Sequence, residues 1–144
     1  MPLTKADIAR LIPHAGTMCL LDGVVAWDDA SIRCTAISHR APDNPLLDGG
    51  RLAAVCGVEY AAQAMAVHGG LAGGGKRPAA GYLASVRDLT CHVGRLDDVA
   101  EDLIIEADRL MGEGSSVIYS FMVRAGGREL LSGRAAVVID AGVP

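Results

Sequence analysis

The stretch Ser38–Met65, SHRAPDNPLLDGGRLAAVCGVEYAAQAM, decides the fold, because a proline-containing loop with one histidine leads into a long apolar segment. From Leu52 to about Ala72 the chain is rich in alanine and contains no proline, and a glycine-rich stretch ends it, which predicts a helix. Apolar residues occupy both the face that contains Glu59 and the opposite face. A helix that is apolar on nearly all sides is a buried helix, so we expect a sheet to wrap around it.

Strand patterns lie on both sides of this helix. Residues 18–27, MCLLDGVVAW, and 31–38, SIRCTAIS, predict two strands joined by a tight turn, and a short helix at Lys5–Leu11 with Thr4 as its N-cap precedes them. Three or four strands are predicted after the helix, from GYLASVRDLTCHV (81–93), in which the alternation is imperfect, and from DLIIEADRLM (102–111), SVIYSFMVRA (116–125) and ELLSGRAAVVI (129–139). This order predicts an α+β fold with an antiparallel sheet around one long central helix, and it excludes a doubly wound parallel sheet.

Length and composition narrow the class of protein. With 144 residues, the chain is expected to form a single domain over 1–144, and its 51% hydrophobic fraction suggests that a partner subunit covers part of its surface. The net charge of −4 and the scattered Lys and Arg give no basic stripe for nucleic acid and no polybasic membrane patch. No apolar run suits a transmembrane helix and the charged N-terminus does not suit a signal peptide, so we expect a cytoplasmic protein.

Neither a disulfide framework nor a metal site is expected. The cysteines are widely spaced, and in a reducing compartment they are interpreted as small buried residues; they are Cys19, Cys34, Cys56 and Cys91. The histidines never fall at metal-ligand spacing with a carboxylate or a thiol. We therefore predict a protein without a bound metal.

Glu59 is the residue that most needs a chemical explanation. An ionised carboxylate is costly in apolar surroundings, and no Lys or Arg lies between Arg51 and Lys76 to pair with it at helical spacing. A carboxyl group that keeps its proton there could serve as a general acid. His39, in the preceding loop, is the side chain best suited to act as a base at cellular pH, and Gln63 could orient Glu59 from one helical turn away.

Less specific interpretations stay open on the residues alone. A lone glutamate in a helix is usually solvent-facing or salt-bridged, and a lone histidine in a loop usually lies on the surface. His68, near the end of the predicted helix, is interpreted as a capping residue, because a cation there favours the helix dipole.

Three motifs resemble a known family. Residues 12–27, IPHAGTMCLLDGVVAW, resemble the PHRxPFLLVDRV opening of the hotdog-fold β-hydroxyacyl-(acyl carrier protein) dehydratases. Residues 39–45, HRAPDNP, resemble the GHFPxNPxxPG catalytic loop of that family, and residues 58–65, VEYAAQAM, resemble its xExxAQ helix signature. The resemblance is nearer still to a divergent dehydratase-like subfamily of aryl-polyene and related polyketide-type clusters, and it covers essentially the whole chain.

The resemblance implies a site and its partners. By position, His39 matches the catalytic histidine and Glu59 the catalytic acid, which in the family come from different subunits of a dimer. The implied substrate-binding positions are Gln63, Asn44, Gly49, Gly50 and His14, with a glycine N–H at the helix start holding the thioester carbonyl. The implied partner is acyl carrier protein, whose phosphopantetheine arm carries the substrate, and no cofactor is needed. The chain would assemble as a homodimer or a larger homo-oligomer, or with a second hotdog dehydratase subunit.

The implied reaction is dehydration of a 3-hydroxyacyl thioester to a trans-2-enoyl thioester, as in fatty-acid or polyene biosynthesis. His39 would remove the α-proton and Glu59 would protonate the leaving hydroxyl, which suits a solvated base and a buried acid. Two alternatives remain: a thioesterase of the same fold, in which the carboxylate activates water, and a non-catalytic dehydratase-like subunit. The second alternative is motivated by Ser38, which stands where the family has a glycine before the histidine.

Overall fold

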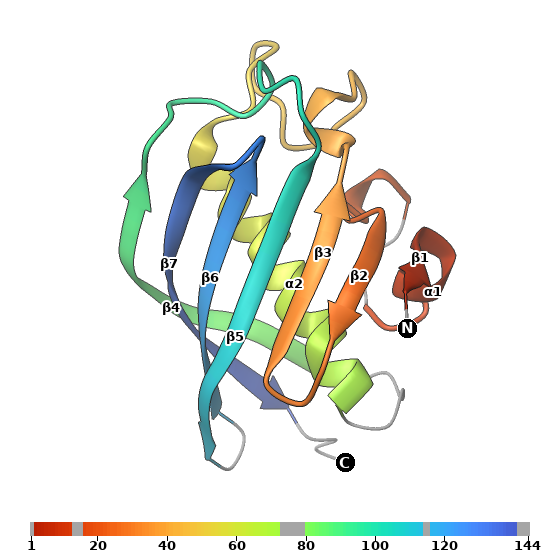
Figure 1. Cartoon of the computed structure of the whole chain (residues 1–144), viewed down its shortest axis with the longest axis vertical. Coiled ribbons are helices and arrows are strands. Elements are labelled where there is room, and N and C mark those ends of the chain that lie inside the picture. Colours follow the sequence, from red (N-terminus) through yellow and green to blue (C-terminus); the bar gives the residue numbers. More distant parts are fainter. Residues whose placement is uncertain (1, 13–15, 73–79, 114–115, 141–144) are drawn as a thin grey trace.

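The computed structural model describes residues 2–12, 16–72, 80–113 and 116–140 (Figure 1). In chain order the elements are β1 (Leu3–Thr4), α1 (Lys5–Ala9), the 3₁₀ turn η1 (Gly16–Met18), β2 (Gly23–Trp27), β3 (Ser31–Ala36), η2 (Ser38–Arg40), η3 (Ala54–Cys56), α2 (Gly57–Ala72), β4 (Ala80–Cys91), β5 (Leu103–Glu113), β6 (Ser116–Ala125) and β7 (Arg128–Asp140).

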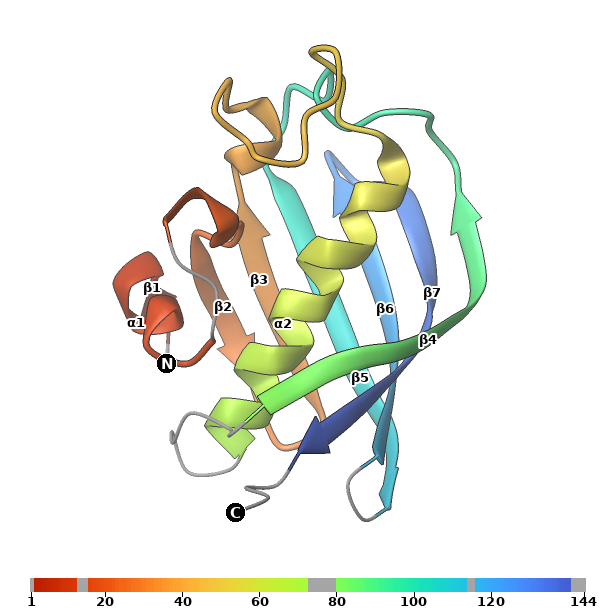
Figure 2. The same cartoon turned by 180° about the vertical axis from the view of Figure 1, so that it is seen from behind.

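The described strands form one seven-stranded sheet in the order β1-β2-β3-β5-β6-β7-β4, and every neighbouring pair is antiparallel. The sheet curves around α2, which lies along its concave face, and β4 passes across the lower end of the helix (Figure 2). The chain enters α2 after β3 and leaves it into β4, which becomes the edge strand beside β7. The predicted α+β arrangement, with the sheet wrapped around one long helix, is confirmed.

Side-chain alternation fixes which face of the sheet meets the helix. In β6 every second residue from Val117 to Ala125 is buried, and the residues between them are partly exposed. A shift of one residue would turn this apolar set away from the core, so burial specifies the register. Gly57, the first residue of α2, lies against β7, because a Cβ built there would be 2.6 Å from Leu131 Cδ2.

The N-terminal helix begins as the sequence predicts and ends earlier. The Thr4 hydroxyl accepts a hydrogen bond from the N–H of Asp7, and the Asp7 carboxylate accepts one from the N–H of Thr4. This reciprocal capping box stabilises the first turn. The helix ends at Ala9 instead of Leu11. Within the described ranges, no helix combines the length and the apolar character needed to cross a bilayer.

His68 does not cap α2, contrary to the sequence interpretation. Its side chain is fully buried and forms hydrogen bonds with one residue between β2 and β3 and with one residue of β6. His68 Nε2 lies 2.8 Å from the carbonyl oxygen of Asp28, and His68 Nδ1 lies 2.7 Å from the hydroxyl of Tyr119. A carbonyl only accepts, so Nε2 donates to Asp28, and in the neutral ring Nδ1 accepts from Tyr119. The histidine therefore anchors the last turns of α2 to the β2–β3 connection and to β6.

Replacing His68 with alanine should lower the free energy of unfolding by about 3 kcal/mol, because it removes two buried hydrogen bonds and leaves a cavity. Urea denaturation measures this change. His92→Ala, at a half-exposed histidine beside Glu129, is the matched control and should change stability by less than about 1 kcal/mol. Equal midpoints for His68→Ala and the unmodified protein would contradict this role.

Candidate active site

The loop that contains His39, the start of α2 and the segment before β5 meet at one end of the sheet (Figure 1, top). His39 is fully buried, and its Nε2 atom lies 3.1 Å from the carbonyl oxygen of Val99 and 3.0 Å from that of Glu101. Because both neighbours only accept, Nε2 carries the proton and donates. In the neutral ring the lone pair is then on Nδ1, which is buried and has no hydrogen-bond partner among the described residues.

Arg40 fixes the same loop to the same segment from the outside. Its guanidinium donates to the carbonyl oxygen of Ala100 and, at 2.6 Å, to the carboxylate of Asp102. Consecutive residues of η2 therefore hold consecutive backbone positions of the segment before β5. This double attachment determines the tautomer of His39 and the direction in which Nδ1 points.

A chain of buried polar groups connects the histidine loop to α2. Asn44 donates from Nδ2 to the carbonyl oxygen of Ser38, 2.8 Å away, and to the hydroxyl of Tyr60, 3.0 Å away. The Ser38 hydroxyl donates to the carbonyl oxygen of Leu20 at 2.8 Å, so at 2.8 Å it must accept the Tyr60 O–H. Asn44 Oδ1 accepts from the N–H of Leu46, so the Asn44 side chain is satisfied at both ends.

Gln63 holds Glu59 and the segment before β2 together. Its Oε1 accepts from the N–H of Leu20 at 2.9 Å, and its Nε2 donates to the carbonyl oxygen of Met18 at 2.7 Å. The same Nε2 lies 3.4 Å from Glu59 Oε1. Gln63 is fully buried and Glu59 is half-buried. The predicted orientation of Glu59 by Gln63 is therefore present as a contact between neighbouring turns of α2.

Gly49 and Gly50 do not lie at the start of the helix. Asp48 and Arg51 exchange backbone hydrogen bonds of 2.9 and 3.0 Å, and the two glycines between them have φ values of 59° and 76°. Positive φ at both central residues makes this an exposed type I′ turn, which glycine forms without strain. Helical structure begins only at Ala54, so a helix-start N–H would come from residues 53–57.

The start of the helix is tied to the segment that also holds His39. Leu52 donates its N–H to the Asp97 carboxylate at 2.9 Å and accepts from the N–H of Leu96 at 2.8 Å. Hydrogen bonds from Arg95 and from the N–H of Leu52 hold the pKa of Asp97 well below its usual range. Residues 95–101 therefore position both the histidine loop and the first helical turn.

Burial of the two predicted catalytic residues is the reverse of the expectation. The sequence suggested a solvated base and a buried acid, whereas His39 is fully buried and Glu59 is half-buried. The Nε2 side of the buried histidine is held by the backbone carbonyls of two distant residues, Val99 and Glu101.

The other predicted site residues have different positions in the structure. Gln63 and Asn44 support the segments of the site, and Gly49 and Gly50 form a surface turn. His14 lies outside the described residues.

Sequence reasoning missed Tyr60, whose hydroxyl joins the histidine loop to α2. A large side chain with a polar tip among the small residues around it was the signal that could have found it.

Burial lowers the pKa of His39 from the ordinary 6.5, against the opposing effect of the Glu101 carbonyl. As the pH falls, the unfolded chain therefore takes up a proton before the folded protein does, and stability decreases below about pH 6.5. We expect an NMR titration to give His39 a pKa below 6.5. The His39→Gln variant keeps an amide that can donate to the carbonyls and has no group that titrates there. Its stability should therefore lack the decrease below about pH 6.5 that His39 causes. A His39 pKa above 6.5 would contradict the buried neutral ring.

An antiparallel sheet wrapped around a long buried helix is the arrangement of the hotdog fold. Solved structures of that class are similar to this chain. A chain of the dehydratase heterocomplex ApeI:P from Xenorhabdus doucetiae aligns with a TM-score of 0.81 and 24% identity, covering 92% of this chain and 90% of its own. Zebrafish thioesterase superfamily member 2 aligns with a TM-score of 0.66 and 14% identity, covering 94% of both chains.

The thioesterase PA1618 of Pseudomonas aeruginosa, in a mutant form, aligns with a TM-score of 0.56 and 13% identity, covering 83% of this chain and 80% of its own. No curated protein matches the sequence. The sequence model of the ApeP-like family, described as ApeP dehydratase, matches residues 6–141. The chain belongs to this family, and the predicted kinship with hotdog-fold dehydratases is confirmed.

Proposed function

We propose that this protein dehydrates 3-hydroxyacyl thioesters carried by acyl carrier protein to trans-2-enoyl thioesters, with His39 as base and Glu59 as acid. The observation that carries the proposal is the state of His39. Its Nε2–H is held by two backbone carbonyls, which leaves a basic lone pair on Nδ1, and burial keeps the ring neutral. Membership of a dehydratase family supports the reaction type.

The elimination consists of two proton transfers. Nδ1 of His39 takes the α-proton of the thioester, and the electron pair moves to form the α,β double bond. Protonated Glu59 gives its proton to the β-hydroxyl, which leaves as water. Gln63 Nε2, 3.4 Å from Glu59 Oε1, orients that carboxyl group. A backbone N–H among residues 53–57 would stabilise the enolate-like oxygen, because these groups lie at a helix start.

We propose that a second hotdog subunit, a copy of this chain or a related dehydratase subunit, completes the site. Three features support this assembly. Among the described strands, the long edge strand β4 pairs only with β7, and it exposes Leu83 and Leu89. The Glu59 side of α2 is incompletely covered along Cys56, Ala62 and Ala66. Unpaired strand edges and uncovered apolar strips are typical of subunit interfaces.

Access to His39 gives the second subunit a further role. Nδ1 is buried within the single chain, so a substrate reaches it only if surrounding residues shift, and His39 itself lies on the loop of residues 38–53. We propose that the second subunit holds this loop in the open position and contributes its own Glu59, or the equivalent acid, to the opposite wall of the substrate channel. The heterocomplex character of the ApeI:P assembly supports a dehydratase subunit as the partner.

Incubating the purified protein with a 3-hydroxyacyl carrier-protein thioester tests the reaction. Dehydration produces the ultraviolet absorbance of the conjugated enoyl thioester and no free thiol. Release of thiol without enoyl product would instead select the thioesterase function. An absence of both products, with the protein alone and with added second subunit, would contradict the proposed function.

A second candidate function is that of a non-catalytic subunit, and the enclosed Nδ1 of His39 favours it. In that case the pure protein is inactive, and activity appears only on mixing with a catalytic hotdog subunit. His39→Gln in this chain distinguishes the two functions in the mixture. The variant remains fully active if this chain only supports its partner, and it loses activity if His39 is the base.

A further inference from the structure

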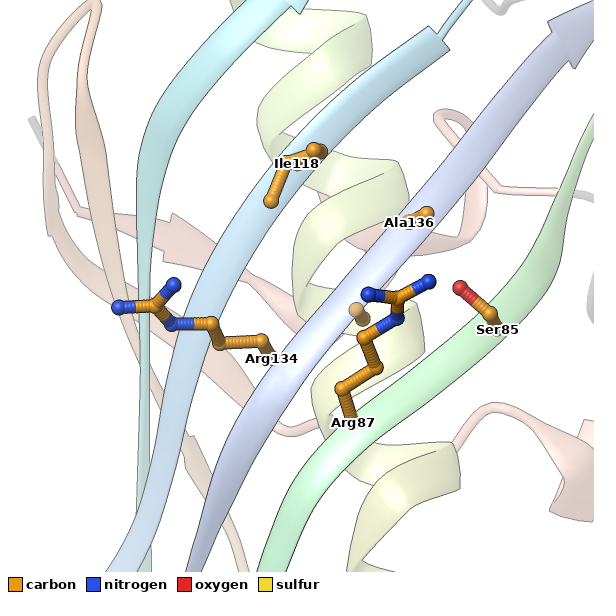
Figure 3. A pocket seen from close by; sticks show the side chains of 6 residues that line it. Ser85, Arg87, Ile118, Arg134 and Ala136 are labelled. Atoms are coloured by element: carbon orange, nitrogen blue, oxygen red, sulfur yellow. The ribbon is translucent and has the colours of Figure 1, made fainter.

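Two arginines lie directly opposite each other on the outer face of the sheet, away from α2. The β4–β7 register pairs Arg87 with Arg134, and the adjacent pair on the same face is Ser85 and Ala136. Together with Ile118 of β6 these residues line a shallow hollow of about 280 Å³ (Figure 3). Both arginines are exposed, and Ile118 and Ala136 form a partly buried apolar floor.

The arginine pair has no carboxylate partner in the part of the chain that the structure describes, where neither side chain forms a salt bridge. Two outer-face carboxylates are engaged elsewhere, Glu106 by two arginines at 3.0 Å and Glu129 by a histidine at 2.6 Å. Asp88 and Asp108 line the neighbouring hollow beside Arg134, and neither forms a salt bridge with it. Like charges directly opposite each other across two strands are destabilising. Figure 3 shows the guanidiniums pointing apart, with Arg134 lying across β6 and Arg87 turned toward Ser85.

We infer that this hollow is a binding site for phosphate esters. Two guanidinium forks and the Ser85 hydroxyl provide donors from three directions, which suits a tetrahedral oxyanion better than a planar carboxylate. Rotation about exposed side-chain bonds brings the guanidiniums of Arg87 and Arg134 toward an anion between β4 and β7. The negative charge of a shared ligand would then offset the repulsion between the two guanidiniums. The apolar floor of Ile118 and Ala136 accommodates the carbon chain next to the phosphate.

Two kinds of molecule carry a phosphate ester next to a carbon chain. One is the phosphodiester of a prosthetic arm, as on a carrier protein, and the other is the phosphate groups of a nucleotide thioester. The site lies on the face opposite α2 and contains none of the residues proposed for elimination. Binding there is therefore measured without turnover, and a failure of the dehydratase proposal leaves the result interpretable.

Isothermal titration of the full-length protein with inorganic phosphate, 4′-phosphopantetheine and adenosine 3′,5′-bisphosphate tests the site. We expect at least one of the two esters to bind more tightly than inorganic phosphate, and the tighter ester identifies the source. Arg134→Gln and Arg87→Gln should each weaken that binding by about tenfold, because each removes one charge-assisted donor pair. Arg134→Lys, which keeps the charge and loses the fork, should give an intermediate affinity.

Arg128→Gln is the matched control, because it makes the same change of charge at an exposed arginine that begins β7. It should bind the ester as the unmodified protein does. Equal weakening by Arg128→Gln would show a general charge effect and overturn the site. Failure of both esters to bind more tightly than inorganic phosphate would overturn it as well.

Discussion

Replacing Glu59 with glutamine is expected to slow enoyl thioester formation by about a thousandfold, because the amide keeps the shape of the side chain and cannot donate an acidic proton. The carbonyl oxygen of the introduced amide can still accept from Gln63 Nε2, and the side chain at this position is only half-buried, so the fold should be unchanged. The measurement is the initial rate of enoyl absorbance at saturating substrate, with circular dichroism melting as the check on folding.

Glu101→Gln provides the matched control for this variant. Its side chain lies at the same end of the molecule and is exposed, and only its backbone carbonyl contacts His39. We therefore expect a rate within about twofold of the unmodified protein, because the general-acid group is intact. A Glu59→Gln protein that turns over at the rate of the Glu101→Gln control would remove Glu59 from the mechanism.

The second large effect is expected at Gln63, where leucine should lower the free energy of unfolding by about 3 kcal/mol. The variant leaves the N–H of Leu20 and the carbonyl oxygen of Met18 without their partners, and a buried polar group without a partner is costly. It also removes the donor beside Glu59, so activity should fall even at temperatures where the protein is folded. Urea denaturation and enoyl formation measure the two effects separately.

Gln63→Glu distinguishes the contribution of the hydrogen bond with Leu20 from that of the hydrogen bond with Met18. A carboxylate oxygen can still accept from the N–H of Leu20, but nothing donates to Met18, and a second carboxylate then faces Glu59. We expect a loss of stability that grows with pH as the new group ionises. If Gln63→Leu unfolds at the same urea concentration as the unmodified protein, the buried amide has no supporting role.

The fold was predictable because its main signals are local. The alanine-rich, proline-free run from Leu52 to Ala72 specifies a helix by composition, and the alternation from Ser116 to Ala125 specifies a strand by period. The helix itself starts at Gly57, after a single 3₁₀ turn. The absence of a polar face on the helix showed that a sheet must wrap it, since nothing else in a chain of 144 residues could cover it.

The surroundings of the site were not predictable, because distant residues create them. The carbonyls of Val99 and Glu101, 60 and 62 positions away from His39, accept hydrogen bonds from its Nε2, and backbone groups carry no signal in the sequence. The two glycines before the helix illustrate a second limit. The pair Gly49–Gly50 matches both a helix-start glycine motif and a type I′ turn, and only the hydrogen bonds between Asp48 and Arg51 distinguish them.

The central claim is that His39 of one subunit works with Glu59 of another, and mixing inactive subunits tests it most directly. His39→Gln and Glu59→Gln proteins are unfolded together, refolded as a mixture and assayed with the 3-hydroxyacyl carrier-protein thioester. In a two-fold dimer, about half of the refolded dimers are mixed and each has one intact site, so about a quarter of the unmodified activity should return. Mixed dimers that form and remain as inactive as either variant alone would contradict a shared site.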